Sequence, residues 1–392
     1  MTVAKQGYSE VVFTFWRTAA LLVALAFTAS HAAQIRFERV PENGIQPQAI
    51  VETNRRVHLL FFKGDAMGGD VFYTMRNSEE KEFGSTMKVN QQPGSVLAAG
   101  TMRGPQMAIG KYGRAHVVWM GGNGADKVVV GGEKTTPLLY ARLSESKRQF
   151  ETERNILTHI GGLDGGQAIA ADQKGSVYVI WHGAPPHVEG EEERGLYVAR
   201  STDGGTTFER EEKAKLPKKG SCACCGIRAI TDGSDALHVL FRSAEAGVNR
   251  PQLWLRSEDQ GKSFEIMQEH PWTTATCPAS SMGFSVAGNR IAASWETNGR
   301  VVGGVYHPKV MEELKTASNG KQKHPRVALN KRGETLLTWV EDVGWGTEGT
   351  LAVQLFDVNG RAVGETSKKL KLPAWSFGAP YAQANGDFVV LY

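Results

Sequence analysis

The chain of 392 residues has little charge of one sign and, after its N-terminus, no run of apolar residues long enough to cross a membrane. Its 45 Lys and Arg residues nearly balance its 41 Asp and Glu residues, which leaves a net charge of +4. A surplus this weak, spread along the chain, argues against a nucleic-acid partner. We interpret the short basic run at residues 213–220 as a solvated loop.

The N-terminus has the three parts of a secretory signal peptide. Lys5 and Arg17 precede an apolar run at residues 18–29, and small residues follow at 30–33. This order of basic, apolar and small residues predicts cleavage after Ala32 or Ala33. The apolar run is short for a membrane span. We therefore expect a signal peptide at residues 1–33 and one domain at residues 34–392, exported to the periplasm or the extracellular space, with no membrane span after cleavage.

The sequence also lacks any long segment with the period of a helix. It instead repeats a short alternating apolar stretch that ends on an aromatic residue, at intervals of 44 to 62 residues. These marker aromatics are Phe61, Trp119, Trp181, Phe241, Trp295, Trp339 and Tyr392. A Gly or Asn turn and a second apolar stretch precede each one, and the 45 glycines suit many such turns. The pattern predicts a β-hairpin repeated seven times.

Two further strands are expected after each of the first six hairpins. Four antiparallel strands in about 50 residues are typical of a propeller blade. We therefore predict an all-β fold, a β-propeller of four-stranded blades, with seven blades favoured and six as the alternative. The last hairpin reaches the C-terminus without its outer strands. A strand at residues 34–40 would complete that blade and close the ring without an exposed edge.

Two polar turns share the pattern Ser-x-Asp-x-Gly-x-Ser/Thr-Phe, and each falls between the third and fourth strands of its unit. We expect the Asp to accept hydrogen bonds from backbone N–H groups of its own turn. The second Gly of each turn can take a positive φ, and the Phe can fill the gap between sheets. The motif is therefore interpreted as structural. Its residues are Ser201, Asp203, Gly205, Phe208, Ser257, Asp259, Gly261 and Phe264.

This pattern resembles the Asp-box (BNR) repeat of sialidases and related propellers. Degraded copies lie at residues 78–83 and 144–150, and the blade spacing covers the mature chain. The resemblance implies a sialidase-like propeller directed at carbohydrate, either by binding a glycan or by weak hydrolysis of a glycoside. Asp boxes also occur in propellers that are not enzymes. A non-enzymatic periplasmic scaffold or interaction propeller, with a protein partner, is therefore the alternative.

The resemblance implies a site around the central channel, on the face opposite the Asp boxes. A sialidase needs three arginines for the substrate carboxylate, a Tyr activated by a Glu, and an acid/base carboxylate. The catalytic candidates on the loops of that face are Asp65, Asp70, Glu296, Glu341, Asp342 and Tyr381. The substrate-binding candidates are Arg103, Arg228, Arg242, Arg250, Arg326 and Trp345. For each of them the alternative is an ordinary solvated loop residue.

One departure from the family pattern bears on activity. Sialidases carry an Arg-Ile-Pro motif at the first inner strand, but Gln48 stands where that arginine is expected. No Tyr is obviously paired with a Glu. These departures count against exo-sialidase activity.

The four cysteines, Cys222, Cys224, Cys225 and Cys277, are not part of the sialidase pattern. In an exported protein an even number suggests disulfides, with three ways to pair four thiols. Cys222 and Cys277 precede their marker aromatics by 19 and 18 residues, at matching places of adjacent blades. A disulfide from Cys277 to one of the other three is therefore reasonable. The alternatives are copper or zinc bound by thiolates with His182 or His187, and redox-active thiols. No other cofactor is expected.

Three further histidines occupy one position of the repeat. His58, His116 and His238 each stand three residues before a marker aromatic, and Tyr178 takes the same place in another unit. Recurrence at one point of a repeat indicates packing, so we do not expect these side chains to bind a ligand.

Overall fold

The structure of the protein, a computed structural model, describes residues 32–53, 55–307, 310–316 and 320–392. The expected signal peptide therefore lies outside the described residues, apart from Ala32 and Ala33. Residues from Ala33 to Tyr392 form one compact unit. Within the described part of the chain, no helix has the length and apolar character needed to cross a membrane.

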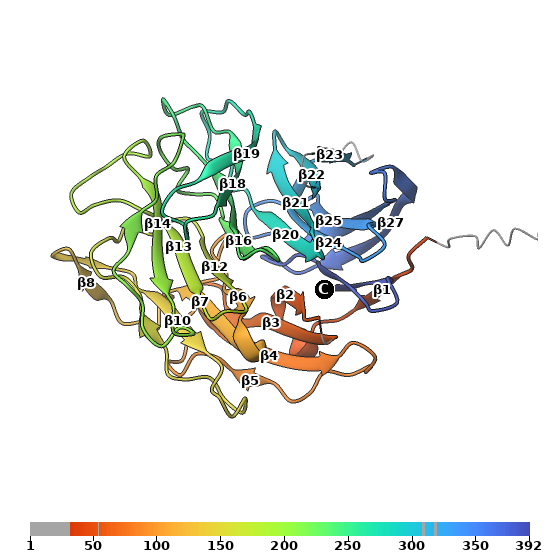
Figure 1. The fold of residues 1–392 in the computed structure, drawn as a ribbon, viewed down its shortest axis with the longest axis horizontal. Helices are drawn as coiled ribbons and strands as arrows, with labels where there is room; N and C mark the ends of the chain where they lie inside the picture. The colour runs from red at the N-terminus through yellow and green to blue at the C-terminus, as the bar shows by residue number, and fades with distance from the viewer. Residues whose placement is uncertain (1–31, 54, 308–309, 317–319) are drawn as a thin grey trace, which may run out of the picture. The chain divides into compact units, whose positions relative to one another are not determined.

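Seven sheets stand around a ring as the blades of a propeller (Figure 1). In six of them four strands follow one another from the centre outward in chain order. The first blade has β2 (Ile45–Val51), β3 (Arg56–Asp65), β4 (Gly68–Asn77) and β5 (Met87–Lys88). The second has β6 (Gln106–Ile109), β7 (Ala115–Met120), β10 (Leu138–Arg142) and β11 (Arg154–Asn155). The third has β12 (Gln167–Ala171), β13 (Val177–Gly183), β14 (Gly195–Ser201) and β15 (Glu212–Lys213).

The remaining blades continue the same order. The fourth has β16 (Arg228–Thr231), β17 (Leu237–Arg242), β18 (Gln252–Ser257) and β19 (Glu265–His270). The fifth has β20 (Met282–Ala287), β21 (Arg290–Thr297), β22 (Arg300–His307) and β23 (Val310–Lys315). The sixth has β24 (Gln322–Leu329), β25 (Thr335–Glu341), β26 (Gly349–Phe356) and β27 (Ala362–Leu372). The seventh has β28 (Ala379–Ala382), β29 (Phe388–Leu391) and β1 (Ile35–Glu38).

Short elements lie between these strands. A hairpin of β8 (Val128–Val130) and β9 (Glu133–Thr135) extends from the second blade, and two 3-10 turns, η1 (Pro41–Asn43) and η2 (Lys111–Gly113), complete the described elements. The prediction of an all-β propeller is confirmed, and the count of seven blades is correct where six was the alternative.

The ring is closed by strands from the two ends of the chain. β1 pairs with β29, with Ile35 opposite Phe388 and Glu38 opposite Leu391. This pairing is parallel, whereas the strands of the other blades pair antiparallel to their neighbours. Beyond the paired residues, the backbone N–H of Val40 donates to the Tyr392 oxygen at 2.9 Å. The seventh blade therefore has three strands in the described part of the chain.

The hydrophobic core is divided among the seven interfaces between neighbouring blades. Each large cluster of buried residues draws its members from two adjacent blades. Trp119 of the second blade, for example, packs with Leu60 and Tyr73 of the first. Trp181, Trp295 and Trp339 each belong in the same way to the interface with the preceding blade. The marker aromatics therefore occupy equivalent sites around the ring, as predicted.

The polar turn at residues 201–208 is held by its own side chains. The Asp203 carboxylate accepts the backbone N–H groups of Thr206 and Thr207, both at 2.9 Å. Gly205 N–H donates to Ser201 Oγ at 2.9 Å. Desolvation acts to raise the pKa of Asp203, but the hydrogen bonds from Thr207, Ser201 and Thr206 outweigh it and lower the pKa to about 2.

The second turn repeats this arrangement, and the predicted hydrogen bonding is present in both. Asp259 accepts the Ser263 N–H at 2.9 Å, and Gly261 N–H donates to Ser257 Oγ at 2.8 Å. Both turns lie between the third and fourth strands of their blades. Phe264 is buried in the interface between the third and fourth blades.

Gly205 fixes the first turn against the preceding blade. Its φ is +75°, and a Cβ there would lie 1.9 Å from the Tyr140 hydroxyl oxygen. Phe208 packs edge-on against the same Tyr140 ring, 4.9 Å between centroids. Gly204, with a φ of +69°, has no atom within 4 Å of such a Cβ. The turn therefore requires glycine at 205 for close approach as well as for conformation.

Replacing each of these glycines by Ala separates the two effects. Gly204→Ala should lower the free energy of unfolding by about 1 kcal/mol, the cost of a Cβ at positive φ. Gly205→Ala carries that cost and also overpacks the blade interface, for a total of about 3 kcal/mol. Urea unfolding of both variants measures the difference. Equal losses would show that the contact with Tyr140 does not hold the two blades together.

The histidines at the repeated position are buried and bonded within their blades. His58 Nδ1 lies 2.6 Å from the Tyr73 hydroxyl, and His116 Nδ1 lies 2.7 Å from the Tyr140 hydroxyl. Trp254 Nε1 donates to His238 Nδ1 at 3.1 Å. The prediction that this position serves packing is confirmed. Burial, with the charges of Arg114 and Arg142, lowers the pKa of His116 to about 3.

His116 should make the fold less stable in mild acid. Its pKa in an unfolded chain is about 6.5. Between that value and pH 3 the unfolded state binds a proton on His116 that the folded state does not. The stability that neutral His116 gives the folded state is therefore fully present above pH 6.5 and is lost as the pH falls. By pH 5 the loss amounts to about 2 kcal/mol. His116→Gln should flatten the pH dependence of the urea unfolding energy between pH 7 and 5. An unchanged slope would contradict the assignment.

Candidate functional site

A cavity of about 590 Å³ occupies the centre of the ring and is lined by residues from the inner strands of all seven blades. This volume lies within the usual range for sites that bind small molecules. Gln48 and Gln106 line it from the first two blades, and Arg228 and Arg326 from the fourth and sixth. The inner strands therefore bring polar side chains from distant parts of the sequence to one space.

The two arginines occupy the same register position in their blades. Arg228 pairs with Leu240 and Arg326 with Thr338, in each case the residue just before the marker aromatic. Gln48 holds this position in the first blade, opposite Leu60. Gln48 is the residue that replaces the expected sialidase arginine. Its side chain instead joins two blades, through the backbone N–H and oxygen of Met107.

Neither arginine forms an ion pair with a carboxylate of the described residues. Arg228 and Arg326 are 8% and 9% exposed, and each donates to the carbonyl oxygen of the residue before it. Arg326 Nη2 has no hydrogen-bond partner among the described residues. Burial lowers the pKa of Arg228 to about 10, and burial together with the charge of Arg228 lowers that of Arg326. The two cations therefore share one desolvated region.

Two neighbours shape the space around Arg326. Its guanidinium lies 3.7 Å from the centre of the Phe377 ring, a cation–π contact. Gly283 holds the equivalent register position of the fifth blade, between the two arginine blades. A Cβ on Gly283 would lie 3.3 Å from Arg326 Cα and 3.5 Å from its Cδ. The missing side chain leaves room for the arginine.

The charges of the cavity are mostly positive. Four basic residues line it, Arg55, Arg228, Arg326 and Lys331, against one acidic residue, Glu52. Two of these charges, Arg228 and Arg326, lie within low-dielectric walls, which strengthens their attraction for anions, whereas Arg55 is exposed and pairs with Glu79 at 2.7 Å. The Glu52 carboxylate lies 3.0 Å from His58 Nε2. Glu52 follows the last residue of β2, whereas Gln46 lies near the start of that strand.

The arginine end of the cavity lies beneath the loop face. Residues 97–105, between the first and second blades, reach the sixth blade, where Thr101 Oγ1 is 2.6 Å from His324 Nδ1. Met102 of this segment is 1% exposed and lies beside Gly166 and Gly226. At the other end of the cavity the lining residues Arg55 and Lys331 are exposed. The lining residues at this end, beside the hairpin turns, therefore reach solvent.

The five predicted carboxylates do not line this cavity. Asp65 accepts the Met67 N–H in its own turn, and Asp70 pairs with Lys88 at 2.9 Å. Glu341 accepts Trp339 Nε1 at 2.9 Å, and Asp342 is exposed in the following loop. Glu296 is 1% exposed and lies 2.8 Å from Lys323, and burial raises its pKa to about 7 although Lys323 opposes the shift.

The remaining binding candidates are engaged within the loops. Arg103 pairs with Asp164 at 3.0 Å and faces the Trp345 ring at 5.8 Å. Arg250 pairs with Glu191 at 2.5 Å. Arg242 donates to the backbone oxygens of Arg250 and Glu296. Trp345 is 62% exposed. Two of the five arginines therefore meet at the cavity, and the three-arginine clamp of a sialidase is not formed by this set.

Tyr381 lines the cavity, but its hydroxyl is turned toward the ring closure. The hydroxyl oxygen accepts Arg76 Nη2, and Arg76 also pairs with Glu38 of β1 at 2.7 Å. Burial raises the pKa of Tyr381 even though Arg76 acts to lower it. A phenol kept protonated in this way is a poor nucleophile.

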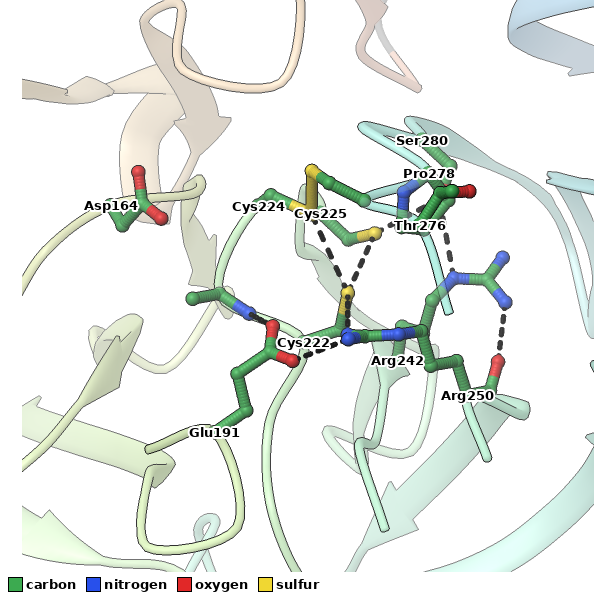
Figure 2. The surroundings of a disulfide bond; sticks show 12 residues. Asp164, Glu191, Cys222, Cys224, Cys225, Arg242, Arg250, Thr276, Pro278 and Ser280 are labelled. Atoms are coloured by element: carbon green, nitrogen blue, oxygen red, sulfur yellow. Dashed lines mark hydrogen bonds and ion pairs between the residues drawn. A yellow bond between two sulfur atoms is a disulfide. The ribbon is translucent and has the colours of Figure 1, made fainter. Parts of the chain in front are cut away.

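None of the cysteines lines the cavity, and Cys222, Cys224 and Cys225 lie close together on a loop (Figure 2). A disulfide joins Cys224 to Cys277, across the fourth and fifth blades. Cys222 and Cys225 are free and fully buried, with their sulfur atoms 3.2 Å apart. The Cys225 N–H donates to the Cys222 oxygen, so residues 222–225 form one tight turn. This turn brings three sulfur atoms within 4.8 Å of one another.

Polar groups surround the two free thiols. Arg250 Nη1 lies 3.1 Å from Cys222 Sγ, and Ser280 Oγ lies 3.3 Å from Cys225 Sγ. The hydrogen bond with Cys225 raises the pKa of the Cys222 thiol. Burial acts to raise the pKa of Cys225, but its hydrogen bond with Cys222 and the charge of Arg242 outweigh burial and lower it.

The two candidate histidine ligands are not part of this cluster. His182 is fully buried, with Nε2 2.8 Å from the Cys225 backbone oxygen and Nδ1 bonded to Ser221. Its ring nitrogens are therefore already engaged. His187 is exposed and pairs with Glu133 at 2.8 Å. The described residues that could hold a metal together are the three cysteines of the turn.

Several cavity residues were not among the sequence candidates. Phe377, Arg55, Lys331 and Glu52 line the cavity with the arginines. The register of the repeat could have identified the cavity arginines from the sequence, because Gln48, Arg228 and Arg326 share one position relative to the marker aromatics. The residues at the hairpin end gave no such signal, because that face was expected to be structural.

Solved structures of low identity resemble this fold. A Hadza microbial sialidase is 12% identical, with a TM-score of 0.50 over 81% of this chain and 69% of that chain. The Trypanosoma rangeli sialidase in complex with the inhibitor DANA is 13% identical, with a TM-score of 0.52 over 80% of this chain and 56% of that chain. A PL25 ulvan lyase bound to -[GlcA(1-4)Rha3S]- is 11% identical, with a TM-score of 0.53 over 86% and 88%. These likenesses show a sialidase-like fold alone. No family model and no curated protein matches the chain.

The unpaired arginine should reduce the stability of the fold. A buried charge without a counterion costs free energy that an apolar side chain of similar length does not. Arg326→Met should therefore raise the free energy of unfolding by about 1–2 kcal/mol, and the thioether still packs on Phe377. Urea unfolding without added anions measures the change. A loss of stability would show that Arg326 is a structural residue.

Proposed function

We propose that this protein binds an acidic saccharide in its central cavity, with the Arg228 and Arg326 guanidinium groups as the anchors for the carboxylate. The observation that carries the proposal is the pair of buried arginines that have no carboxylate partner among the described residues. A bound carboxylate would supply the missing counterion and accept charge-assisted hydrogen bonds from both. The surplus of basic residues along the cavity supports the same class of ligand.

The proposal of a saccharide, rather than another anion, rests on analogy of fold. Structural neighbours with this fold are sialidases and an ulvan lyase whose bound saccharide contains GlcA, an acidic sugar. The cavity volume of about 590 Å³ suits one or two sugar rings.

The geometry favours binding over hydrolysis. Glycoside hydrolysis of the usual kind needs two carboxylates on either side of the bond, or a tyrosine nucleophile with its activating carboxylate. The predicted carboxylates lie outside the cavity lining, and the pKa of Tyr381 is raised. We therefore propose a binding protein, and we keep weak hydrolysis as the alternative that an activity assay would reveal.

We also propose that the protein acts after export. The basic, apolar and small segments of residues 1–33 support a signal peptide. The Cys224–Cys277 disulfide supports an oxidising compartment such as the periplasm. Such a location would give the cavity access to saccharides outside the cytoplasm.

Calorimetric titration with glucuronic acid, N-acetylneuraminic acid and glucose tests the proposed function. Glucose matches glucuronic acid except for the carboxylate, so glucose should bind at least about tenfold more weakly. Arg228→Met and Arg326→Met should each weaken binding of the acidic sugar by about 10- to 100-fold, because each removes a charged hydrogen bond.

Arg148→Met is the matched control, because Arg148 is exposed on a loop outside the cavity lining. Its affinity for the acidic sugar should equal that of the unmodified protein. Equal affinity for glucose and glucuronic acid, or full binding by Arg326→Met, would contradict the proposal.

A further inference from the structure

The sulfur cluster on the loop face has a geometry that neither the sugar-binding proposal nor the fold explains. Cys222 Sγ lies 3.2 Å from Cys225 Sγ and 3.7 Å from Cys224 Sγ. All three sulfur atoms lie within 4.8 Å of one another, and they come from one turn of four residues. A fold that needed just one disulfide between blades would have no use for two further buried thiols at its side.

These distances fit a single thiolate-bound cation. Thiolate sulfur lies about 2.3 Å from Zn²⁺, so two ligands of a tetrahedral or trigonal site are about 3.8–4.0 Å apart. The separations of 3.2 and 3.7 Å from Cys222 approach that value. Sulfur ligands select soft or borderline cations such as Cu(I) and Zn(II).

The surroundings carry positive charge that an anionic cluster would offset. Arg242 is fully buried, and its guanidinium forms no ion pair with a described carboxylate. Arg250, next to Cys222, pairs with Glu191 alone. Two guanidinium groups therefore lie near the thiols, with Glu191 as the ion-pair partner of Arg250 and with Glu296, which pairs with Lys323, near Arg242. A cation held by three thiolates has a net negative charge, which balances this surplus.

Exposure divides the four cysteines into two pairs. Cys222 and Cys225 are fully buried, whereas Cys224 is half-buried and Cys277 is exposed. The disulfide between Cys224 and Cys277 therefore lies where an external reagent can reach it. While this bond exists, Cys224 cannot act as a thiolate ligand.

We propose that Cys222, Cys224 and Cys225 form a binding site for a thiophilic cation, Cu(I) or Zn(II), that opens when the Cys224–Cys277 disulfide is reduced. The reductant is an external dithiol. It transfers two electrons and two protons to the disulfide, which becomes two cysteine thiols, and the dithiol leaves as its own disulfide. The cation then replaces the thiol protons of the three ligands, which pass to solvent. The exposed Cys277 remains outside the site.

Two single variants isolate the third ligand. Both Cys277→Ser and Cys224→Ser break the disulfide, but Cys277→Ser keeps the Cys224 thiol. Cys277→Ser should therefore bind one equivalent of Cu(I) or Zn(II) without prior reduction, and Cys224→Ser should bind at least about tenfold more weakly. Competition against a chromophoric chelator, with each cation in a separate arm, gives the affinities and shows which cation is preferred.

The unmodified chain supplies a test that needs no substitution. Protein reduced by a dithiol, with the reagent then removed, should bind one cation per chain and should keep a single reactive thiol, that of Cys277. The oxidised protein should bind at least about tenfold more weakly. Thermal unfolding confirms that reduced protein and variants remain folded. Equal binding by reduced and oxidised protein, equal binding by the two variants, or no cation bound by any folded form would each overturn the proposal.

Discussion

The packing of each blade against its two neighbours is the constraint on which the structure depends. A blade of four short strands buries little apolar surface within itself, and its large side chains instead meet those of the adjacent blade. The marker aromatics all face the preceding blade, so no blade has a complete core alone. Stability is therefore shared around the ring, and the spacing of the repeat in the sequence follows from this shared packing.

The candidate functional features are departures from that repeated packing. The ring accepts Gln48, Arg228, Gly283 and Arg326 at equivalent positions, and the two charged members are buried without a counterion among the described residues. A free energy cost of this kind is expected at sites that serve function. The sulfur cluster is a second departure, because it places ionisable thiols in a buried loop where other blades have none.

Local sequence patterns predicted the fold of this protein better than they predicted its candidate site. The blade number, the marker aromatics and the Ser201 and Asp203 turn depend on local patterns, and they were predicted. The choice among the arginines was not predicted, because the register that Arg228 and Arg326 share relative to the marker aromatics was not used to separate them from Arg103 and Arg242. The sequence also left the partner of Cys277 open, since three cysteines lie within four residues, and in the structure the partner is Cys224, the half-buried one of the three. The contact of Thr101 with His324, which joins the loop after the first blade to the sixth blade, depends on tertiary structure and was not predicted.

The pairing of β1 with β29 has a consequence for biogenesis. These strands are separated by nearly the whole described chain, so their contact has the highest possible sequence separation and is expected to form late. A ribosome or translocase delivers the N-terminal strand first, and that strand must then wait, unpaired, for the last residues to arrive. During that interval β1 has no partner strand and the ring is incomplete. A chaperone or a second nascent chain that bound β1 would determine whether the ring closes.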